Sequence, residues 1–176
     1  MLLKLKYFLL FLIVLPGVNF AQVEILKPDV NQSTSFAIFA DAKTFDNCKE
    51  AILNYKNAVE KDGLSAYVVY SDWKTPDDVK NEILKLYSLK PVLEGVVFVG
   101  DIPIAMIRNA QHMTTAFKID QDRYAWFRST VPSDRFYDDF DLKFDYLSHD
   151  TVNTLSHYYS LRSDSPQRIQ RDIYSA

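Results

Sequence analysis

The stretch from Leu93 to Pro103 constrains the fold more than any other part of the sequence. It holds an unbroken apolar run rich in β-branched residues, with Gly95 and Gly100 at its ends. Such a run is typical of a strand that is buried on both faces. A strand of this kind needs other strands at its sides and helices above and below it. The sequence therefore predicts an α/β fold with this strand at its centre.

The residues before this run supply the other elements. Ser35–Asp41 and Ala66–Asp72 are short apolar runs that predict two strands. Apolar residues at helical spacing predict a helix over about Phe45–Lys61. A second helix is predicted to begin after Thr75, which can cap it, and to end before Pro91. Strands and helices that alternate through short connections indicate parallel pairing, and hence a three-layer α/β sandwich with a parallel sheet.

The pattern becomes less regular after Pro103. Aromatic residues crowd the segment 117–146, and most of these rings are expected to pack against the sheet edge, with sugar stacking or a neighbouring domain as alternatives. Leu142–Leu147 predicts a strand, Leu155–Arg162 a helical turn, and Ile173–Ala176 the start of another strand. We therefore expect an α/β domain over residues 35–176 that is truncated at its C-terminal end.

The first 21 residues have the layout of a secretory signal peptide. Lys4 and Lys6 precede the apolar run Tyr7–Leu15, and cleavage is expected after Ala21. The apolar run is shorter than the roughly 20 residues that cross a bilayer, so cleavage is favoured over a retained membrane anchor. The chain is expected to be secreted, periplasmic or on the cell surface, with no stable membrane span. Residues 22–34 are polar and predict a linker.

Charge and cysteine content exclude several classes of protein. The formal net charge is −3, which argues against a nucleic-acid partner. The single cysteine, Cys48, excludes an internal disulfide and a cysteine-based metal cluster. Cys48 lies on the apolar stripe of the first helix, so we interpret it as a small buried hydrophobe, not as a nucleophile paired with a histidine. The histidines, His112, His149 and His157, are expected at the surface.

Each of the three predicted strands ends in or is followed by an aspartate: Asp41, Asp72 and Asp101. The carboxyl ends of parallel strands share one edge of a sheet, where open α/β folds place their ligands. These carboxylates are therefore candidates to bind a divalent cation or a basic group, as in a metal-dependent hydrolase. The alternative is that each aspartate ends its strand and caps the next helix.

A second acidic group lies in the aromatic-rich segment. Its carboxylates are candidates for calcium binding, because calcium takes oxygen ligands from flexible acidic loops. The spacing does not match an EF-hand, and a solvated acidic loop is the ordinary alternative. The residues are Asp134, Asp138, Asp139, Asp141 and Asp145.

Several segments, taken in order, resemble the first half of the catalytic domain of gingipain-type secreted cysteine peptidases. Gly95–Pro103 reads Gly-Val-Val-Phe-Val-Gly-Asp-Ile-Pro and is similar to the family's Val-Gly-Asp strand followed by Ile-Pro. Ser133–Tyr137 reads Ser-Asp-Arg-Phe-Tyr and is similar to its Ser-Asp-x-x-Tyr segment. Ile173–Ala176 lies where its Ile-Gly-Arg-like strand begins. The resemblance covers about Ser35–Tyr146.

The resemblance implies a caspase-like fold, which belongs with flavodoxin-like proteins among the α/β sandwiches. It also implies a histidine base and a cysteine nucleophile that act on a protein or peptide substrate without a cofactor. The family's histidine lies in a Gly-His-Gly segment and its cysteine follows a further strand, and neither motif occurs in this sequence. No catalytic residue is therefore carried over. The alternative is a non-catalytic secreted module that binds a peptide, a glycan or a cation.

Overall fold

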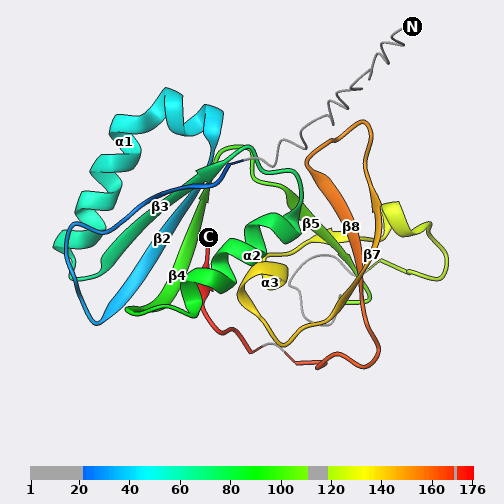
Figure 1. Cartoon of the computed structure of the whole chain (residues 1–176). Coiled ribbons are helices and arrows are strands. Elements are labelled where there is room, and N and C mark those ends of the chain that lie inside the picture. Colours follow the sequence, from blue (N-terminus) through cyan, green and yellow to red (C-terminus); the bar gives the residue numbers. More distant parts are fainter. Residues whose placement is uncertain (1–21, 111–118, 169) are drawn as a thin grey trace, which may run out of the picture.

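The computed structural model describes residues 22–110, 119–168 and 170–176, which form two β-sheets with helices packed against them (Figure 1). The predicted signal peptide and His112 lie outside the described residues. Among the helices that are described, none combines the length and the apolar character needed to cross a bilayer.

The larger sheet has five strands and is mostly parallel, which confirms the α/β class. Only β1 runs antiparallel to its neighbour β3. The strand in the middle is β2, not the predicted run around Gly95, which forms β4 and lies next to the short edge strand β9. In order across the sheet, the strands are β1 (Glu24–Leu26), β3 (Ser65–Ser71), β2 (Thr34–Asp41), β4 (Val92–Val99) and β9 (Tyr174–Ser175).

Two helices pack on opposite faces of this sheet. Successive residues of a strand point to opposite faces, so β2 offers Ile38 and Ala40 to one side and Ala37 and Phe39 to the other. Helix α1 (Ala42–Lys61) packs on Ile38 and Ala40, whereas α2 (Pro76–Tyr87) packs on the Ala37 and Phe39 side. The predicted cap of α2 is confirmed, because Thr75 and Asp78 form a reciprocal capping box.

Helix α1 buries a narrower stripe than the sequence predicts. Phe45, Ile52 and Val59 are buried as expected, but Cys48 is exposed. The backbone at Cys48 is not helical (φ −122°, ψ 21°), and the resulting kink changes which side chains face the sheet. The interpretation of Cys48 as a buried hydrophobe was therefore wrong.

The second half of the chain forms a small mixed sheet that the sequence did not predict. Its central pair, β5 and β8, is parallel, and each of the two outer strands is antiparallel to its neighbour. The segment predicted as a helical turn is strand β8. In order across the sheet, the strands are β6 (Val131–Pro132), β5 (Ile104–Arg108), β8 (Ser156–Leu161) and β7 (Phe144–His149).

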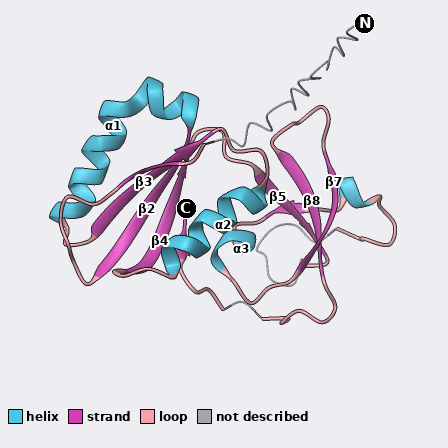
Figure 2. Cartoon of the chain, in the orientation of Figure 1, coloured by secondary structure: helices cyan, strands magenta, loops and turns pink. Residues whose placement is uncertain are grey.

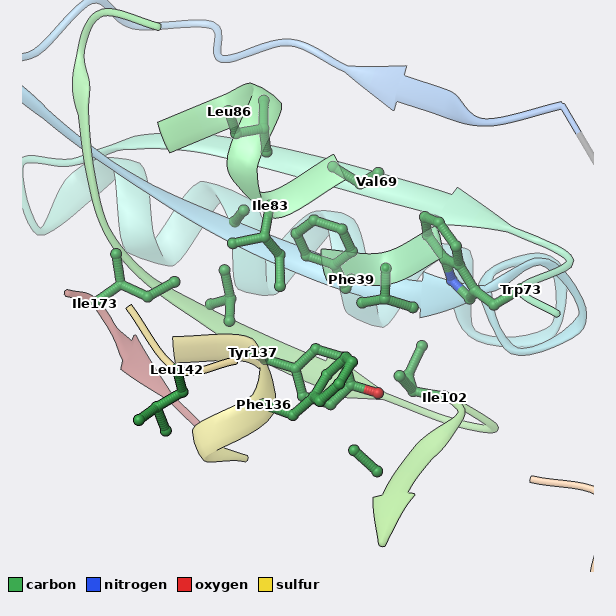
Figure 3. Packing of buried hydrophobic residues seen from close by; sticks show 14 of the residues in the cluster. Phe39, Val69, Trp73, Ile83, Leu86, Ile102, Phe136, Tyr137, Leu142 and Ile173 are labelled. Atoms are coloured by element: carbon green, nitrogen blue, oxygen red, sulfur yellow. The ribbon is translucent and has the colours of Figure 1, made fainter. Parts of the chain in front are cut away.

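Helices α2 and α3 (Arg135–Asp138) lie between the two sheets (Figure 2). Two neighbouring aromatic residues of α3 join them. The ring of Tyr137 lies 5.0 Å from that of Phe98 in β4, and the ring of Phe136 lies 4.5 Å from that of Tyr159 in β8. Figure 3 shows both α3 rings in the same buried cluster as Phe39. These aromatic side chains pack in the core, as predicted.

The segment 22–34 is packed onto the domain, although its sequence predicts a linker. Strand β1 extends the main sheet, and the chain after it is held by α1. Nζ of Lys56, a buried residue, donates to Oδ2 of Asp29 (2.7 Å) and to Oε1 of Glu60 (2.8 Å). Oγ of Ser65 donates to the carbonyl oxygen of Val30 (3.0 Å). Few apolar residues mark this segment, which is why its packing is not evident from hydropathy.

Candidate functional site

The carboxyl ends of β2, β3 and β4 share one edge of the main sheet, as the sequence predicts. The pairing places Asp41 beside Ser71, and Ala40 beside Val99. The three candidate aspartates therefore begin from the same edge. Their side chains form different contacts.

Asp41 joins three elements through its two carboxylate oxygens. Oδ1 accepts the backbone N–H of Thr44 (2.9 Å) and caps α1, and Oδ2 accepts the backbone N–H of Asp101 (2.8 Å). Burial works against the charge, but the hydrogen bonds from Thr44 and Asp101 outweigh it and hold the pKa of Asp41 below its ordinary value. Asp41 is thus the cap that the sequence offered as an alternative to a metal ligand, and it also clamps the turn after β4.

The side chains of Asp72 and Asp101 do not complete a metal site with Asp41. Asp72 forms an exposed ion pair with Lys74, and Asp101 meets Asp41 through its backbone. Within residues 22–110, 119–168 and 170–176, no group of three or more His, Cys, Asp or Glu side chains is arranged to hold a metal ion. The structure brings Asp41 and Asp101 together, whereas Asp72 pairs with Lys74.

An open groove of about 600 Å³ lies beside this edge, between the first described residues and α2. Its lining includes Trp73, whose Nε1–H donates to the carbonyl oxygen of Ala40 (2.8 Å). Charged side chains of both signs line it, and two ion pairs form among them, Asp72 with Lys74 and Glu82 with Lys85. The groove suits a polar ligand. The lining residues are Val23, Ser71, Asp72, Trp73, Lys74, Thr75, Asp78, Asn81, Glu82 and Lys85.

This groove is not evident from the sequence. The helical spacing of Thr75, Asp78, Glu82 and Lys85, which places them on one face of α2, was the available signal. Val23 also lines the groove, and only the fold brings that residue close to α2.

The acidic segment around α3 is solvated only in part, because Asp134, Asp141 and Asp145 are exposed. Asp138 and Asp139 are buried, and Asp138 forms an ion pair with Arg135 and accepts the hydroxyl proton of Ser175. Its second carboxylate oxygen, Oδ1, has no hydrogen-bond partner among the described residues. Burial raises the pKa of Asp138 to about 6, although Ser175 and Arg135 oppose the shift. Calcium binding by this segment stays an untested prediction.

Asp138 gives the stability of the protein a specific pH dependence. Its folded-state pKa lies above the unfolded value of about 3.9, so its contribution to the free energy of unfolding is largest in acid and falls as the pH rises from about 4 to 6. Asp138→Asn removes this titration. We compare the free energy of unfolding of the variant with that of wild type at each pH. This difference, variant minus wild type, should increase by about 2 kcal/mol from pH 4 to pH 7.

Urea unfolding at several pH values measures this difference. Asp141→Asn is the matched control, because Asp141 lies in the same segment and is exposed. Curves for Asp138→Asn and wild type that stay parallel from pH 4 to pH 7 would show that Asp138 ionises normally in the folded protein.

Cysteine and histidine do not meet in the described part of the chain. Cys48 lies on α1, on one face of the main sheet, whereas β7 and β8, which carry His149 and His157, belong to the sheet on the other side (Figure 1). The prediction of surface histidines is wrong for His157, whose exposed fraction is 3%. The described residues therefore contain no cysteine–histidine pair.

Neither protein families, curated proteins nor solved structures gave a match to this chain.

The turn after β4 is packed closely against Asp41 and Thr44. Gly100 adopts φ +86°, and a Cβ atom placed there would lie 2.1 Å from Oδ2 of Asp41 and 2.3 Å from Oγ1 of Thr44. Only glycine fits this position, both because its φ is positive and because Asp41 needs the space. The arrangement fixes the direction in which Asp101 and the following residues leave the sheet.

Proposed function

We propose that this chain is the amino-terminal part of the catalytic domain of an exported, gingipain-like cysteine endopeptidase with a caspase-like, three-layer α/β sandwich. In this proposal the chain is a scaffold that is inactive by itself. The histidine base and the cysteine nucleophile come from other parts of the intact protein, and the substrate is a protein or peptide.

One observation carries the proposal: the segments that resemble the family contact one another. The hydroxyl group of Tyr137, in the Ser-Asp-x-x-Tyr segment, donates to the carbonyl oxygen of Pro103, which ends the Gly-Asp-Ile-Pro segment. The carbonyl oxygen of Asp138, the residue after Tyr137, accepts the backbone N–H groups of Asp172 (2.8 Å) and of Ile173 (3.4 Å), where the third segment begins. Three segments that are remote in sequence thus form one hydrogen-bonded unit.

The last of these segments continues into the main sheet. Strand β9 pairs in parallel with β4, with Tyr174 opposite Gly95. The two backbones are close, since a Cβ atom on Gly95 would lie 3.0 Å from the carbonyl oxygen of Tyr174. A parallel strand in this place supports the family's arrangement, in which a strand follows the Ser-Asp-x-x-Tyr segment.

The second candidate function is a secreted binding module, and the groove beside α2 favours it. Carboxylate and ammonium groups line the groove together, as the ion pairs Asp72–Lys74 and Glu82–Lys85 illustrate. Such a lining suits the backbone and termini of a peptide better than an apolar ligand. In this case the groove itself is the functional site, and no covalent chemistry takes place.

The reading frame and a covalent probe distinguish the two functions. Under the peptidase proposal, the frame at this locus contains a Gly-His-Gly segment and a later cysteine after the codon for Ala176. The protein isolated from its source should then react with a peptidyl acyloxymethyl ketone, a reagent for activated cysteines. The modified cysteine should not be Cys48, and Cys48→Ser should react equally well.

The opposite result is equally clear. If the frame stops after Ala176, the cysteine peptidase proposal is wrong. Cooperative unfolding of the purified chain from Gln22 onward, together with peptide binding that Glu82→Gln weakens, would establish the binding module instead.

A further inference from the structure

Two histidines face each other across the small sheet. His149 of β7 lies directly opposite His157 of β8 in the antiparallel pair. The two imidazole rings are stacked, with centroids 4.3 Å apart and planes 16° from parallel. His149 is exposed, and its Nε2 lies 2.8 Å from the carbonyl oxygen of Thr154, so this nitrogen carries a proton. His157 is buried beneath it.

The ring of His157 has little polar compensation for its burial, because the backbone of Lys74 is the one uncharged polar group in the described part of the chain that favours its protonated form. Neither Nδ1 nor Nε2 has a hydrogen-bond partner among the residues that the structure describes. A neutral imidazole in this place leaves one donor and one acceptor unpaired. A protonated imidazole would add a buried positive charge and a second donor, which is less favourable.

The charged groups around His157 act in both directions. Burial lowers the pKa of His157, and proximity to His149 lowers it further. The carboxylates of Asp77 and Asp78 at the start of α2, and the backbone of Lys74, act in the opposite direction without outweighing the first two effects. The closed sheet therefore favours a neutral His157.

We propose that the His149–His157 pair is a pH-sensitive latch, which holds β7 on β8 at neutral pH and releases it in acid. This inference is independent of the peptidase proposal. In the closed state, protons on both rings would bring two positive charges together at the stacking distance, one of them buried. In the open state, both imidazoles reach water and take up protons freely.

The sign of the effect follows from the two states of His157. In the open state its pKa is the ordinary value of about 6.5, and in the closed state it is lower, so opening takes up a proton as the pH falls below about 6.5. The equilibrium constant for opening then rises by up to tenfold for each pH unit.

The neighbouring carboxylate of Asp150 does not cause the expected rise of the opening constant in acid. Asp150 follows β7, and its Oδ1 accepts the backbone N–H groups of Asn153 and Val152, while its Oδ2 accepts the hydroxyl proton of Tyr158 (3.0 Å). These hydrogen bonds hold the pKa of Asp150 below its ordinary value. Asp150 therefore stays ionised over the pH range in which His157 takes up its proton.

Amide hydrogen exchange of the wild-type chain between pH 7.5 and 5.0 tests the latch. After correction for intrinsic exchange, we expect the opening constant of the β7 and β8 amides to rise up to tenfold per pH unit below about 6.5. That of β2 and β3 should rise less, because global unfolding also exposes Asp138, whose titration has the opposite sign. His157→Phe keeps a ring in the stack and removes the proton site, so its β7 and β8 amides should show no such rise.

Two control variants separate the effect of His157 from the titration of other residues. His112→Asn removes the third imidazole and should behave as wild type. Asp138→Asn removes a titration near pH 6 that has the opposite sign, and the rise in acid should persist in this variant. A rise that survives in His157→Phe, or a wild-type opening constant that does not change with pH, would overturn the latch.

A direct titration keeps the test independent of how the variants fold. Ring resonances of His157 in the wild-type chain, followed by NMR, should give a pKa below the ordinary value of about 6.5. A pKa at or above that value would overturn the proposal regardless of the exchange results.

Discussion

Gly100→Ala is expected to destabilise the protein by at least about 3 kcal/mol. The positive φ of Gly100 costs an alanine about 1 to 2 kcal/mol. The added methyl group would also lie 2.1 Å from Oδ2 of Asp41 and 2.7 Å from Cβ of Thr44, so the clamp on the turn after β4 must open. That opening also deprives the backbone N–H of Asp101 of its acceptor. Urea unfolding followed by circular dichroism measures the loss.

Gly63→Ala is the matched control for this variant. Gly63 also has a positive φ (+95°), but a Cβ atom there would meet no atom within 4 Å. Its loss should be limited to the conformational cost of about 1 to 2 kcal/mol. If the two variants lose the same stability, the close packing of Asp41 against Gly100 contributes nothing.

Lys56→Met is expected to destabilise the protein by about 3 kcal/mol. Lys56 and Glu60 are almost completely buried as side chains (4% and 7% exposed), and Asp29 completes the ion network at 2.7 Å from Nζ. Hydrogen bonds to Asp29 and Glu60 outweigh the cost of burial and raise the pKa of Lys56. Removal of the lysine leaves the carboxylate of Glu60 buried without a cation, which is the costly part. Thermal and urea unfolding give the difference.

Two further variants identify the cause of this loss. Lys43→Met changes an exposed lysine of the same helix and should cost less than about 0.5 kcal/mol. In the double variant Lys56→Met/Glu60→Gln, the amide oxygen can still accept the N–H of Asp29 (2.9 Å in wild type), and the unpaired charge is gone. We expect it to recover about half of the loss. A double variant less stable than Lys56→Met would contradict this explanation.

The first half of the fold could be predicted because its signals are local. Thr75, Pro76 and Asp78 specify the start of α2 within four residues, and the structure has the cap that they predict. The order of the strands depends on pairing between segments that are remote in sequence. The sequence favoured β4 as the middle strand, but β2 occupies that position because β3 and β4 pair on either side of it.

The second half could not be predicted because its strands depend on remote partners. Ile104 pairs with Ser156, and neither strand shows a clear alternation of apolar and polar residues. Strand β8 contains Ser156, His157 and Ser160, three residues that are common in loops, yet the first two are buried. Tertiary packing decides the structure here, not local propensity.

The candidate site was predictable only in part, because some of its contacts are local in sequence and others depend on remote strands. That Asp41 caps α1 follows from its place between a strand and a helix, and the sequence offered this role. That Oδ2 of Asp41 also holds the N–H of Asp101 requires β2 and β4 to be neighbours. The exposure of Cys48 depends on a kink that the spacing of apolar residues does not reveal.

The pairing of remote strands also determines how fast this chain can fold. Strand β2 gains its second neighbour only when Thr34 meets Val92, and β5 gains its parallel partner only when Ile104 meets Ser156. Folds dominated by such non-local contacts form in about milliseconds to seconds, far more slowly than helical bundles. A nascent chain of this kind stays unfolded for longer, and its apolar surface and strand edges stay exposed to other chains during that time.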